Sequence, residues 1–340
     1  MSEAKYLSVA RMLRAGIQNG QYANGSRLPS ENKLVKQTGY SRQTIRQAMA
    51  MLETEGLTER IRGSGTYVRS TRARRPRTNN IAVVTTYIGE YIFPAILQGI
   101  SSVLSQNGYT PLLFATQNRV DTEREALCSL LEKPIDGIIV EGTKTAMPNP
   151  NIDLYEEIGA QGIPVVFVNG YYAELTKPVY VVMNDREGGR MACEALLQEG
   201  HTRIAGFFKS DDIQGHRRYA GYAQALVKAG LSVQDDHVLW YTTENRDLLI
   251  RSSASRVMEG CTAAVCYNDE TALLASDACR GMQADWVSFD QSAYARMPGA
   301  PFRSLGNPKE ALGALAAEKL LHMISGQEEQ PLVLPWSPMA

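Results

Sequence analysis

Four side chains of segment 41–52 can each make two hydrogen bonds to the edge of a planar group. They are Arg42, Gln43, Arg46 and Gln47, and the apolar residues between them recur at intervals of three or four positions. This spacing predicts a helix with one buried apolar face and with the four polar side chains together on the other face. Arginine and glutamine can bond guanine and adenine edges bidentately, so the exposed face suits DNA bases. An ordinary solvated face is the alternative.

The neighbouring segments predict a small DNA-binding fold around this helix. Ser30 and Ser41 each precede an apolar-periodic run, where a hydroxyl can cap the start of a helix, and Gly39 can end the first of the two helices. Two short helices joined by a tight turn form a helix-turn-helix. Residues 57–69 contain two short strand patterns around a glycine turn at 63–65, which predicts a β-hairpin wing.

Charge is divided unevenly along the 340 residues. Residues 1–77 hold 15 Lys and Arg against 5 Asp and Glu, a net charge of +10, whereas residues 78–340 hold 20 against 31, a net charge of −11. A basic first part on an acidic body indicates that only the first part meets a polyanion. We therefore expect a DNA-binding domain over residues 1–70 and a basic linker over residues 71–80 that can contact phosphates.

Residues 81–340 carry alternating strand and helix patterns, which are regular from Ile81 to Phe289. This alternation predicts an α/β fold with two parallel sheets that are covered by helices on both faces. In open sheets of this kind the ligand lies beyond the carboxyl ends of the strands. The polar and aromatic residues that follow the predicted strands are therefore candidate ligand-binding residues: Tyr87, Glu90, Phe93, Glu141, Lys144, Asn169, Gln214, His216, Asn268 and Asp290.

The chemistry of these candidates favours a sugar as the ligand. Carboxylates and amides can pair with adjacent hydroxyl groups, while an aromatic ring covers C–H faces. For Asp185, Asp212 and Asp269, helix capping is the preferred interpretation. A sugar-processing enzyme is the main alternative class, but the sequence contains no GxSxG, HExxH or Walker motif, so we expect no catalytic residues.

The sequence lacks the patterns of disulfides, metal sites, membrane spans and signal peptides. The five cysteines have no CxxC spacing and the four histidines do not complete a zinc pattern, so we expect no disulfide, metal or cofactor. No apolar run approaches the roughly 20 residues that a membrane-spanning helix needs. The first residues are polar and do not resemble a signal peptide, so we expect a cytoplasmic protein without a membrane partner.

The first part of the chain contains motifs that recur together in one family. They are Leu28-Pro29-Ser30-Glu31, Ser41-Arg42-Gln43-Thr44-Ile45-Arg46, Glu55-Gly56-Leu57 and Gly63-Ser64-Gly65-Thr66-Tyr67-Val68. With them, residues 3–69 resemble the winged helix-turn-helix of GntR-family bacterial transcription regulators. The resemblance implies that Glu31, Arg42, Gln43 and Arg46 contact operator DNA, with Arg62 and Gly63 at the tip of the wing.

A second resemblance covers residues 79–335. Segments 81–86, 136–140, 200–204 and 267–272 are similar to the sensor domain of LacI/GalR repressors. This implies a two-lobed, type I periplasmic-binding-protein-like domain of doubly wound parallel sheets over residues 81–340, a sugar between the lobes, and a homodimer on operator DNA.

A GntR-type head on such a body resembles arabinose-responsive repressors. This implies L-arabinose as the effector and release from DNA as the outcome; a regulator that senses another pentose or hexose is the alternative. Segment 281–286 and the ending 335–340 depart from that pattern.

Overall fold

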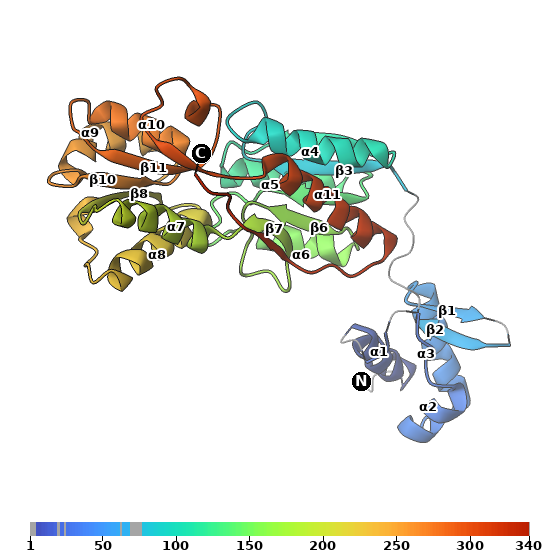
Figure 1. Ribbon diagram of the computed structural model, residues 1–340. Helices are drawn as coiled ribbons and strands as arrows, with labels where there is room; N and C mark the ends of the chain where they lie inside the picture. The colour runs from blue at the N-terminus through green and yellow to red at the C-terminus, as the bar shows by residue number, and fades with distance from the viewer. Residues whose placement is uncertain (1–4, 19–20, 24, 62, 69–76, 340) are drawn as a thin grey trace. The chain divides into compact units, whose positions relative to one another are not determined.

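The computed structural model describes residues 5–18, 21–23, 25–61, 63–68 and 77–339. The chain divides into two compact units between Arg77 and Thr78. In Figure 1 the first unit is blue, and the second runs from cyan to red. Arg62 and most of the expected linker lie outside the described residues.

The first unit contains the predicted helices and hairpin. Ser30 Oγ accepts from the backbone N–H of Lys33 at 3.3 Å, and Ser41 Oγ accepts from that of Thr44 at 3.2 Å, so both predicted caps are confirmed. Gly39 ends the second helix in a left-handed conformation, with φ 71°. The elements are α1 (Lys5–Gln18), α2 (Glu31–Thr38), α3 (Arg42–Thr54), β1 (Thr58–Ile61) and β2 (Gly65–Val68), and the two strands are antiparallel.

The apolar stripe predicted for α3 forms the centre of a small core. Ile45, Ala48 and Leu52 are fully buried, and they pack with Leu13 of α1 and Leu34 of α2. Since this core buries one face of α3, the opposite face stays exposed. The fold of the described part is therefore a helix-turn-helix followed by a wing.

The second unit consists of two lobes. The sheet of lobe 1 is parallel, with the strand order β13-β7-β6-β5-β3-β4. Helices α4 and α11 cover one face of it, and α5 and α6 cover the other (Figure 1). Its elements are β3 (Asn80–Thr85), α4 (Phe93–Gln106), β4 (Thr110–Ala115), α5 (Val120–Leu131), β5 (Gly137–Val140), α6 (Ile152–Ala160), β6 (Val165–Val168), β7 (Val179–Met183), α11 (Lys309–Ser325) and β13 (Leu332–Leu334).

Lobe 2 has the same three-layer arrangement. Its parallel sheet has the order β12-β11-β10-β8-β9, with α7 and α8 on one face and α9 and α10 on the other. Its elements are α7 (Asp185–Gln198), β8 (Ile204–Lys209), α8 (Ile213–Lys228), β9 (Val238–Tyr241), α9 (Arg246–Val257), β10 (Ala263–Cys266), α10 (Asp269–Ala278), β11 (Asp285–Asp290) and β12 (Arg303–Gly306), with short 3₁₀ helices η1 (Asp235–His237) and η2 (Tyr294–Arg296).

The last part of the chain crosses between the lobes and completes both sheets. After β12 the chain enters α11 of lobe 1, and after β13 it returns to lobe 2. There Ser337 and Gly306 exchange two backbone hydrogen bonds of 2.9 and 3.0 Å, and the ring of Trp336 packs against Phe289. The sequence patterns did not predict β12, α11 or β13. The ending that departs from the expected pattern therefore links the two lobes.

Candidate functional site

The exposed face of α3 carries two arginines that share one carboxylate. Glu31 of α2 accepts from Arg42 Nε at 3.0 Å and from Arg46 Nε at 2.9 Å, and Arg60 Nη2 of β1 lies 3.8 Å from its other oxygen. Burial would raise the pKa of Glu31, but the hydrogen bonds and charges of the two arginines outweigh it and lower that pKa. Glu31 is thus ionised at neutral pH. It fixes the directions of two arginines whose side chains are more than half exposed.

The remaining candidates for DNA contact differ in what the structure describes. Gln43 is exposed and lies within about one turn of Arg42 and Arg46 on α3. Gly63 is exposed in the turn between β1 and β2 with φ 81°, a conformation that favours glycine. Arg62 is outside the described residues. The face that the sequence predicts for DNA contact is therefore present and unobstructed within the first unit.

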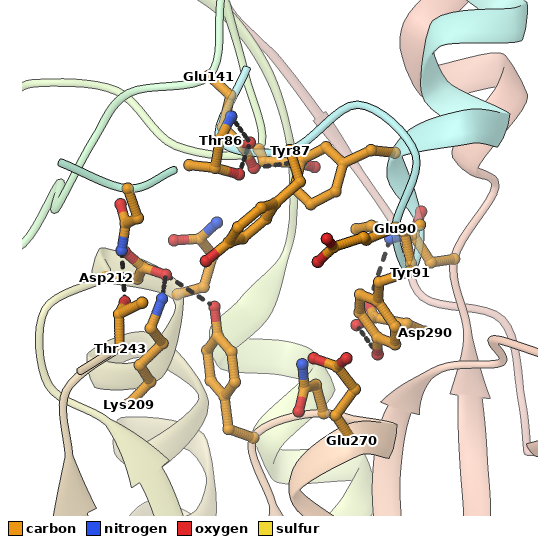
Figure 2. Close-up of a pocket in the computed structure, with 18 of the residues that line it drawn as sticks. Thr86, Tyr87, Glu90, Tyr91, Glu141, Lys209, Asp212, Thr243, Glu270 and Asp290 are labelled. Atoms are coloured by element: carbon orange, nitrogen blue, oxygen red, sulfur yellow. Dashed lines mark hydrogen bonds and ion pairs between the residues drawn. The ribbon is translucent and has the colours of Figure 1, made fainter. Parts of the chain in front are cut away.

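A cavity of about 220 Å³ lies between the two lobes of the second unit (Figure 2). Loops at the carboxyl ends of strands from both sheets form its wall, as expected for ligand sites of open α/β sheets. Its lining residues are Thr86, Tyr87, Glu90, Tyr91, Ile92, Phe93, Asn118, Glu141, Gly142, Asn169, Met183, Asp185, Lys209, Asp212, Gln214, Arg218, Tyr241, Thr243, Arg246, Tyr267, Asn268, Glu270, Asp290 and Asn307.

Two candidate ligand-binding residues lie outside this lining. The backbone of Lys144 is left-handed, with φ 47°, and its ammonium group pairs with Glu244. His216 hydrogen-bonds the carbonyl of Ser210 at 2.8 Å; it stands two residues beyond Gln214 on α8, about 200° around the helix, and so faces away. The other eight candidates line the cavity: Tyr87, Glu90, Phe93, Glu141, Asn169, Gln214, Asn268 and Asp290.

One end of the cavity is built around Glu141, which follows β5. Its carboxylate accepts from the backbone N–H of Thr86 at 3.1 Å, from the Thr86 hydroxyl at 2.5 Å and from Asn169 Nδ2 at 2.9 Å. Burial raises the pKa of Glu141 from 4.5 to about 7, although these hydrogen bonds oppose the rise. At neutral pH the group is therefore present in both protonation states.

A second polar cluster lies at the end of β11, where Tyr91 and Asp290 point toward each other in Figure 2. The Tyr91 hydroxyl donates to Asp290 Oδ2 at 2.6 Å, which connects lobe 1 to lobe 2. Arg218 Nε donates to Asp185 Oδ1 at 2.9 Å, and Arg218 Nη2 lies 4.0 Å from Asp290 Oδ1. Burial raises the pKa of Asp185 to about 6, and the Arg218 charge opposes this rise.

Three oxygen atoms of lining residues are buried without a hydrogen-bond partner among the described residues: Asp185 Oδ2, Gln214 Oε1 and Asn307 Oδ1. A buried acceptor without a partner is costly, by about 1–3 kcal/mol. These three atoms are enclosed by protein, so the carboxylates and amides that have surface in the cavity are the groups that a ligand meets. The rings of Tyr87 and Phe93, with centroids 5.7 Å apart, add an apolar surface. The cavity therefore suits a compact molecule with many hydroxyl groups and an apolar C–H face.

The capping role predicted for Asp185, Asp212 and Asp269 is wrong. Asn184 and Asn268 cap α7 and α10, while Asp212, at the N-cap position of α8, makes no capping hydrogen bond. At α7 and α10 an asparagine that immediately precedes the aspartate occupies the cap, so the aspartate is the first residue of the helix. The three carboxylates instead accept hydrogen bonds from Arg218, from Lys209 Nζ, and from the hydroxyls of Ser288 and Ser304, respectively.

Sequence reasoning also missed lining residues that do not directly follow a strand. Arg218 is the clearest example, because it lies four residues after Gln214 on α8 and therefore on the same helical face. That spacing was a usable signal. Tyr91 offered none, since it reaches the cavity through a left-handed backbone with φ 53°.

Comparison with known proteins agrees with both parts of this description. Residues 5–68 match the model of bacterial regulatory proteins of the gntR family. Residues 78–333 match the model of periplasmic binding proteins and the sugar binding domain of the LacI family. The chain therefore belongs to the LacI family in its sugar-binding domain and carries a gntR-family DNA-binding domain: it is a sugar-sensing transcription regulator.

Two relatives named arabinose metabolism transcriptional repressor match almost the whole chain. The protein from Halalkalibacterium halodurans is 35% identical, with 96% of this chain and 91% of the relative covered. The protein from Geobacillus stearothermophilus is 36% identical, with 94% and 91% covered. The names of both relatives are those of transcription regulators.

Solved structures show the same fold. Transcription regulator CcpA of Lactococcus lactis has a TM-score of 0.68 at 24% identity, with 78% of this chain and 98% of that chain covered. A complex of transcriptional regulator CelR with cellobiose has a TM-score of 0.69 at 20% identity, with 92% and 98% covered. Within the described residues, none of the helices has the length and apolar character for crossing a membrane.

Proposed function

We propose that this protein represses genes for L-arabinose use and leaves its operator when L-arabinose binds between the lobes. The nearly full-length match to two repressors named for arabinose metabolism carries the proposal. A regulator that responds to another pentose or to a hexose is the second candidate, because the cavity chemistry favours a class of ligand and does not select one stereoisomer. The site of action is the cytoplasm, where operator DNA lies.

The charges around the cavity favour a neutral sugar over a sugar phosphate or a sugar acid. An anionic ligand would meet a wall on which carboxylates outnumber cations, so repulsion would weaken its binding. The cavity volume of about 220 Å³ suits a small ligand such as one monosaccharide. The lining carboxylates are Glu90, Glu141, Asp185, Asp212, Glu270 and Asp290, and the lining cations are Lys209, Arg218 and Arg246.

A ligand shifts an equilibrium only if it binds one arrangement of the lobes better than the other. The proposed sugar contacts therefore come from both lobes. From lobe 1 they are Tyr87, Glu90, Phe93, Glu141 and Asn169, and from lobe 2 they are Gln214, Arg218, Asn268 and Asp290. With contacts on both sides, the sugar stabilises the arrangement in which the lobes lie together.

For the operator, we propose that Arg42, Gln43 and Arg46 hydrogen-bond base edges or phosphates. Glu31 orients the two arginines and also contacts the DNA itself. Arg62 and Gly63, which the family resemblance assigns to the wing tip, would follow the DNA backbone. A single recognition helix reads only a few base pairs, so two copies of the chain on two half-sites are the proposed binding unit. The contacts between copies are proposed near α4 and α5 of lobe 1; Leu113 on the neighbouring edge strand β4 is 46% exposed.

The test is operator retention in a gel. The operator is first selected by the protein from a random DNA pool, and retention is then measured with millimolar L-arabinose, D-xylose, D-galactose or D-ribose. Release by L-arabinose alone is the expected result. Release by a different sugar would reject the named ligand and retain a sugar-responsive repressor. Chemical conversion of any of these sugars by the protein would support an enzyme instead.

A further inference from the structure

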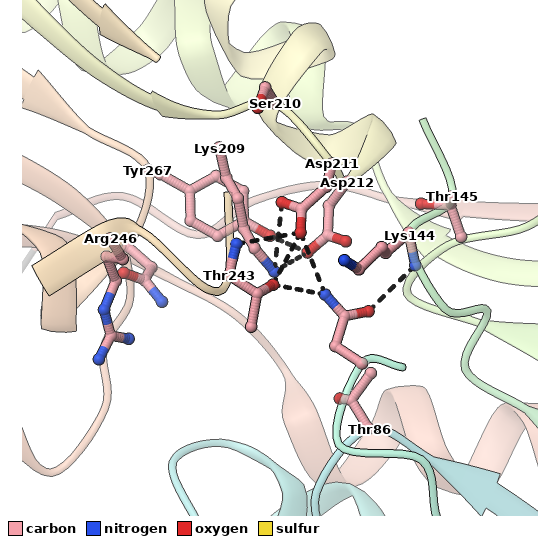
Figure 3. A network of polar contacts seen from close by, with 12 residues as sticks. Thr86, Lys144, Thr145, Lys209, Ser210, Asp211, Asp212, Thr243, Arg246 and Tyr267 are labelled. Carbon is pink, nitrogen blue, oxygen red and sulfur yellow. Dashed lines mark hydrogen bonds and ion pairs between the residues drawn. The ribbon is translucent and has the colours of Figure 1, made fainter. Parts of the chain in front are cut away.

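The lobes are joined by a polar network beside the cavity, seen in Figure 3. At its centre lies Asp211, which is 0% exposed and does not line the cavity. Its Oδ2 accepts from the Thr243 N–H at 3.0 Å and from the Thr243 hydroxyl at 2.8 Å, so it ties the loop after β8 to the loop after β9. From lobe 1, Asn118 Nδ2 reaches the same carboxylate oxygen at 3.4 Å and donates to Thr243 Oγ1 at 2.6 Å. We call Asp211, Thr243 and Asn118 the Asp211 network.

Lobe 1 holds its member of the network in a fixed direction. Asn118 is 1% exposed, and its Oδ1 accepts from the Lys144 N–H at 3.0 Å. Gln117, Asn118 and Lys144 all have left-handed backbones, with φ of 52°, 55° and 47°. Residues other than glycine adopt this region only where surrounding contacts determine it. The two loops of lobe 1 are therefore shaped to present the Asn118 carboxamide to lobe 2.

Two further hydrogen bonds cross between the lobes at the same place. The Ala146 N–H donates to the Asp211 carbonyl at 3.2 Å, and the Ile213 N–H donates to Thr145 Oγ1 at 3.1 Å. The first ends on Asp211 itself, and the second starts from Ile213, two residues further along the chain. The hydrogen bonds from Asn118 and Ala146 and the one to Thr145 require the lobes to lie together, so they add to the stability of that arrangement alone; the bonds between Asp211 and Thr243 lie within lobe 2.

Asp211 is also connected to the wall of the ligand cavity. Its Oδ1 has no hydrogen-bond partner in the described part of the chain and lies 3.8 Å from Lys209 Nζ, which in turn donates to Asp212 Oδ2 at 2.5 Å. Lys209 and Asp212 both line the cavity. The buried Asp211 charge is thus balanced by a cation that faces the ligand space, and Asn118 and Thr243, which hydrogen-bond to Asp211, line that space themselves.

We propose that Asp211 is a positioning residue for the sugar response. By accepting from Asn118 of lobe 1, and by holding Thr243 where it also accepts from Asn118, it stabilises the arrangement with the lobes together and thereby raises sugar affinity without touching the sugar. The reason is thermodynamic: apparent affinity equals intrinsic affinity multiplied by the fraction of protein in the binding-competent state. This role rests on the proposed function, in which a sugar binds between the lobes.

Asp211→Asn is the first test, made in the full-length protein. Calorimetric titration with L-arabinose should show a dissociation constant about tenfold to hundredfold above that of the wild type, since the network loses a charged acceptor. Operator affinity without sugar should not fall, because the operator prefers the lobe arrangement that the sugar disfavours. The matched control is Glu244→Gln, which removes a mostly exposed carboxylate that pairs with Lys144 across the same boundary and should change sugar affinity less than twofold.

A swapped variant separates positioning from general damage. Asn118→Asp alone places two carboxylates against each other and should also weaken sugar binding. Combined with Asp211→Asn, it exchanges donor and acceptor and should restore most of the lost affinity, because position 118 still accepts from the Lys144 N–H. A purely structural role for Asp211 predicts additive losses in the double variant. Failure of this restoration would overturn the proposal.

Single-molecule energy transfer between dyes on the two lobes tests the network independently of the ligand. Without sugar, Asp211→Asn should shift the population toward longer distances, and the swapped variant should shift it back. If the wild type bound none of the four sugars, the proposed function would fail, and this measurement would still decide the role of Asp211. An unchanged distance distribution would overturn it. Should Asp211→Asn not fold, Thr243→Val, which lacks the bridging hydroxyl, must show the same shift in distance.

Discussion

Truncation of Asp290 should separate sugar sensing from DNA binding. The Asp290 carboxylate is 3% exposed; Tyr91 donates to it at 2.6 Å and Arg218 lies 4.0 Å from it, while it also lines the cavity. If it accepts from one sugar hydroxyl, Asp290→Ala removes a hydrogen bond to a charged group, about 1.5–3 kcal/mol. This corresponds to a sugar dissociation constant raised about 10-fold to 150-fold.

The assay for Asp290→Ala combines calorimetry with L-arabinose and operator retention with and without the sugar. Operator affinity without sugar should equal that of the wild type, and millimolar L-arabinose should release much less DNA. Asp285→Ala is the matched control: Asp285 starts the same strand, but its side chain is 60% exposed and pairs with His201 outside the cavity. The reasoning would be refuted by a folded Asp290→Ala protein with wild-type sugar affinity, or by one that loses operator binding without sugar.

Three further predictions address the head, the cavity and the helix packing. Arg46→Ala should weaken operator binding by about 1–3 kcal/mol and should weaken binding to random DNA much less, as measured by competition binding. Equal losses of affinity for the two DNAs would mean that Arg46 reads no bases. Glu141 has its pKa raised from 4.5 in the unfolded chain to about 7, so the folded form binds the proton more tightly. As pH rises from 4.5 to 7, wild type should therefore lose up to about 3 kcal/mol of stability relative to Glu141→Gln, measured by denaturation followed by tryptophan fluorescence; the raised pKa of Asp185 adds a slope common to both proteins. Gly189→Ala would place a Cβ 1.9 Å from the Arg218 carbonyl oxygen, so it should destabilise the protein by about 1–3 kcal/mol and weaken sugar binding. Gly159→Ala, where a Cβ meets no atom within 4 Å, should not lower the melting temperature.

Local patterns were sufficient for most of the architecture. The stripe of Ile45, Ala48 and Leu52 predicted the buried face of α3, and Ser30 and Ser41 cap their helices as expected. Alternating strands and helices predicted both sheets, because parallel strands buried on both faces appear as short apolar runs. The elements after Phe289 were not predicted, since β12 and β13 are strands of four and three residues whose place depends on the crossing between lobes.

The cavity was only partly predictable for a related reason. The rule that ligands lie at the carboxyl ends of strands found residues such as Asn169 and Asp290, which directly follow or end a strand. It could not find Arg218, which enters from the second turn of α8, and it wrongly included His216, which faces away on the same helix. The Asp211 network left no signal, because its members meet only when two lobes fold against each other.

The most direct test of the central claim is a linkage measurement with labelled operator. If L-arabinose releases DNA by binding between the lobes, the factor by which saturating sugar weakens operator binding must equal the factor by which saturating operator weakens sugar binding. Fluorescence anisotropy gives the first factor and calorimetry on the protein–operator complex gives the second. We predict two equal factors well above one. Sugar binding that is the same with and without operator, or tighter in its presence, would contradict the account.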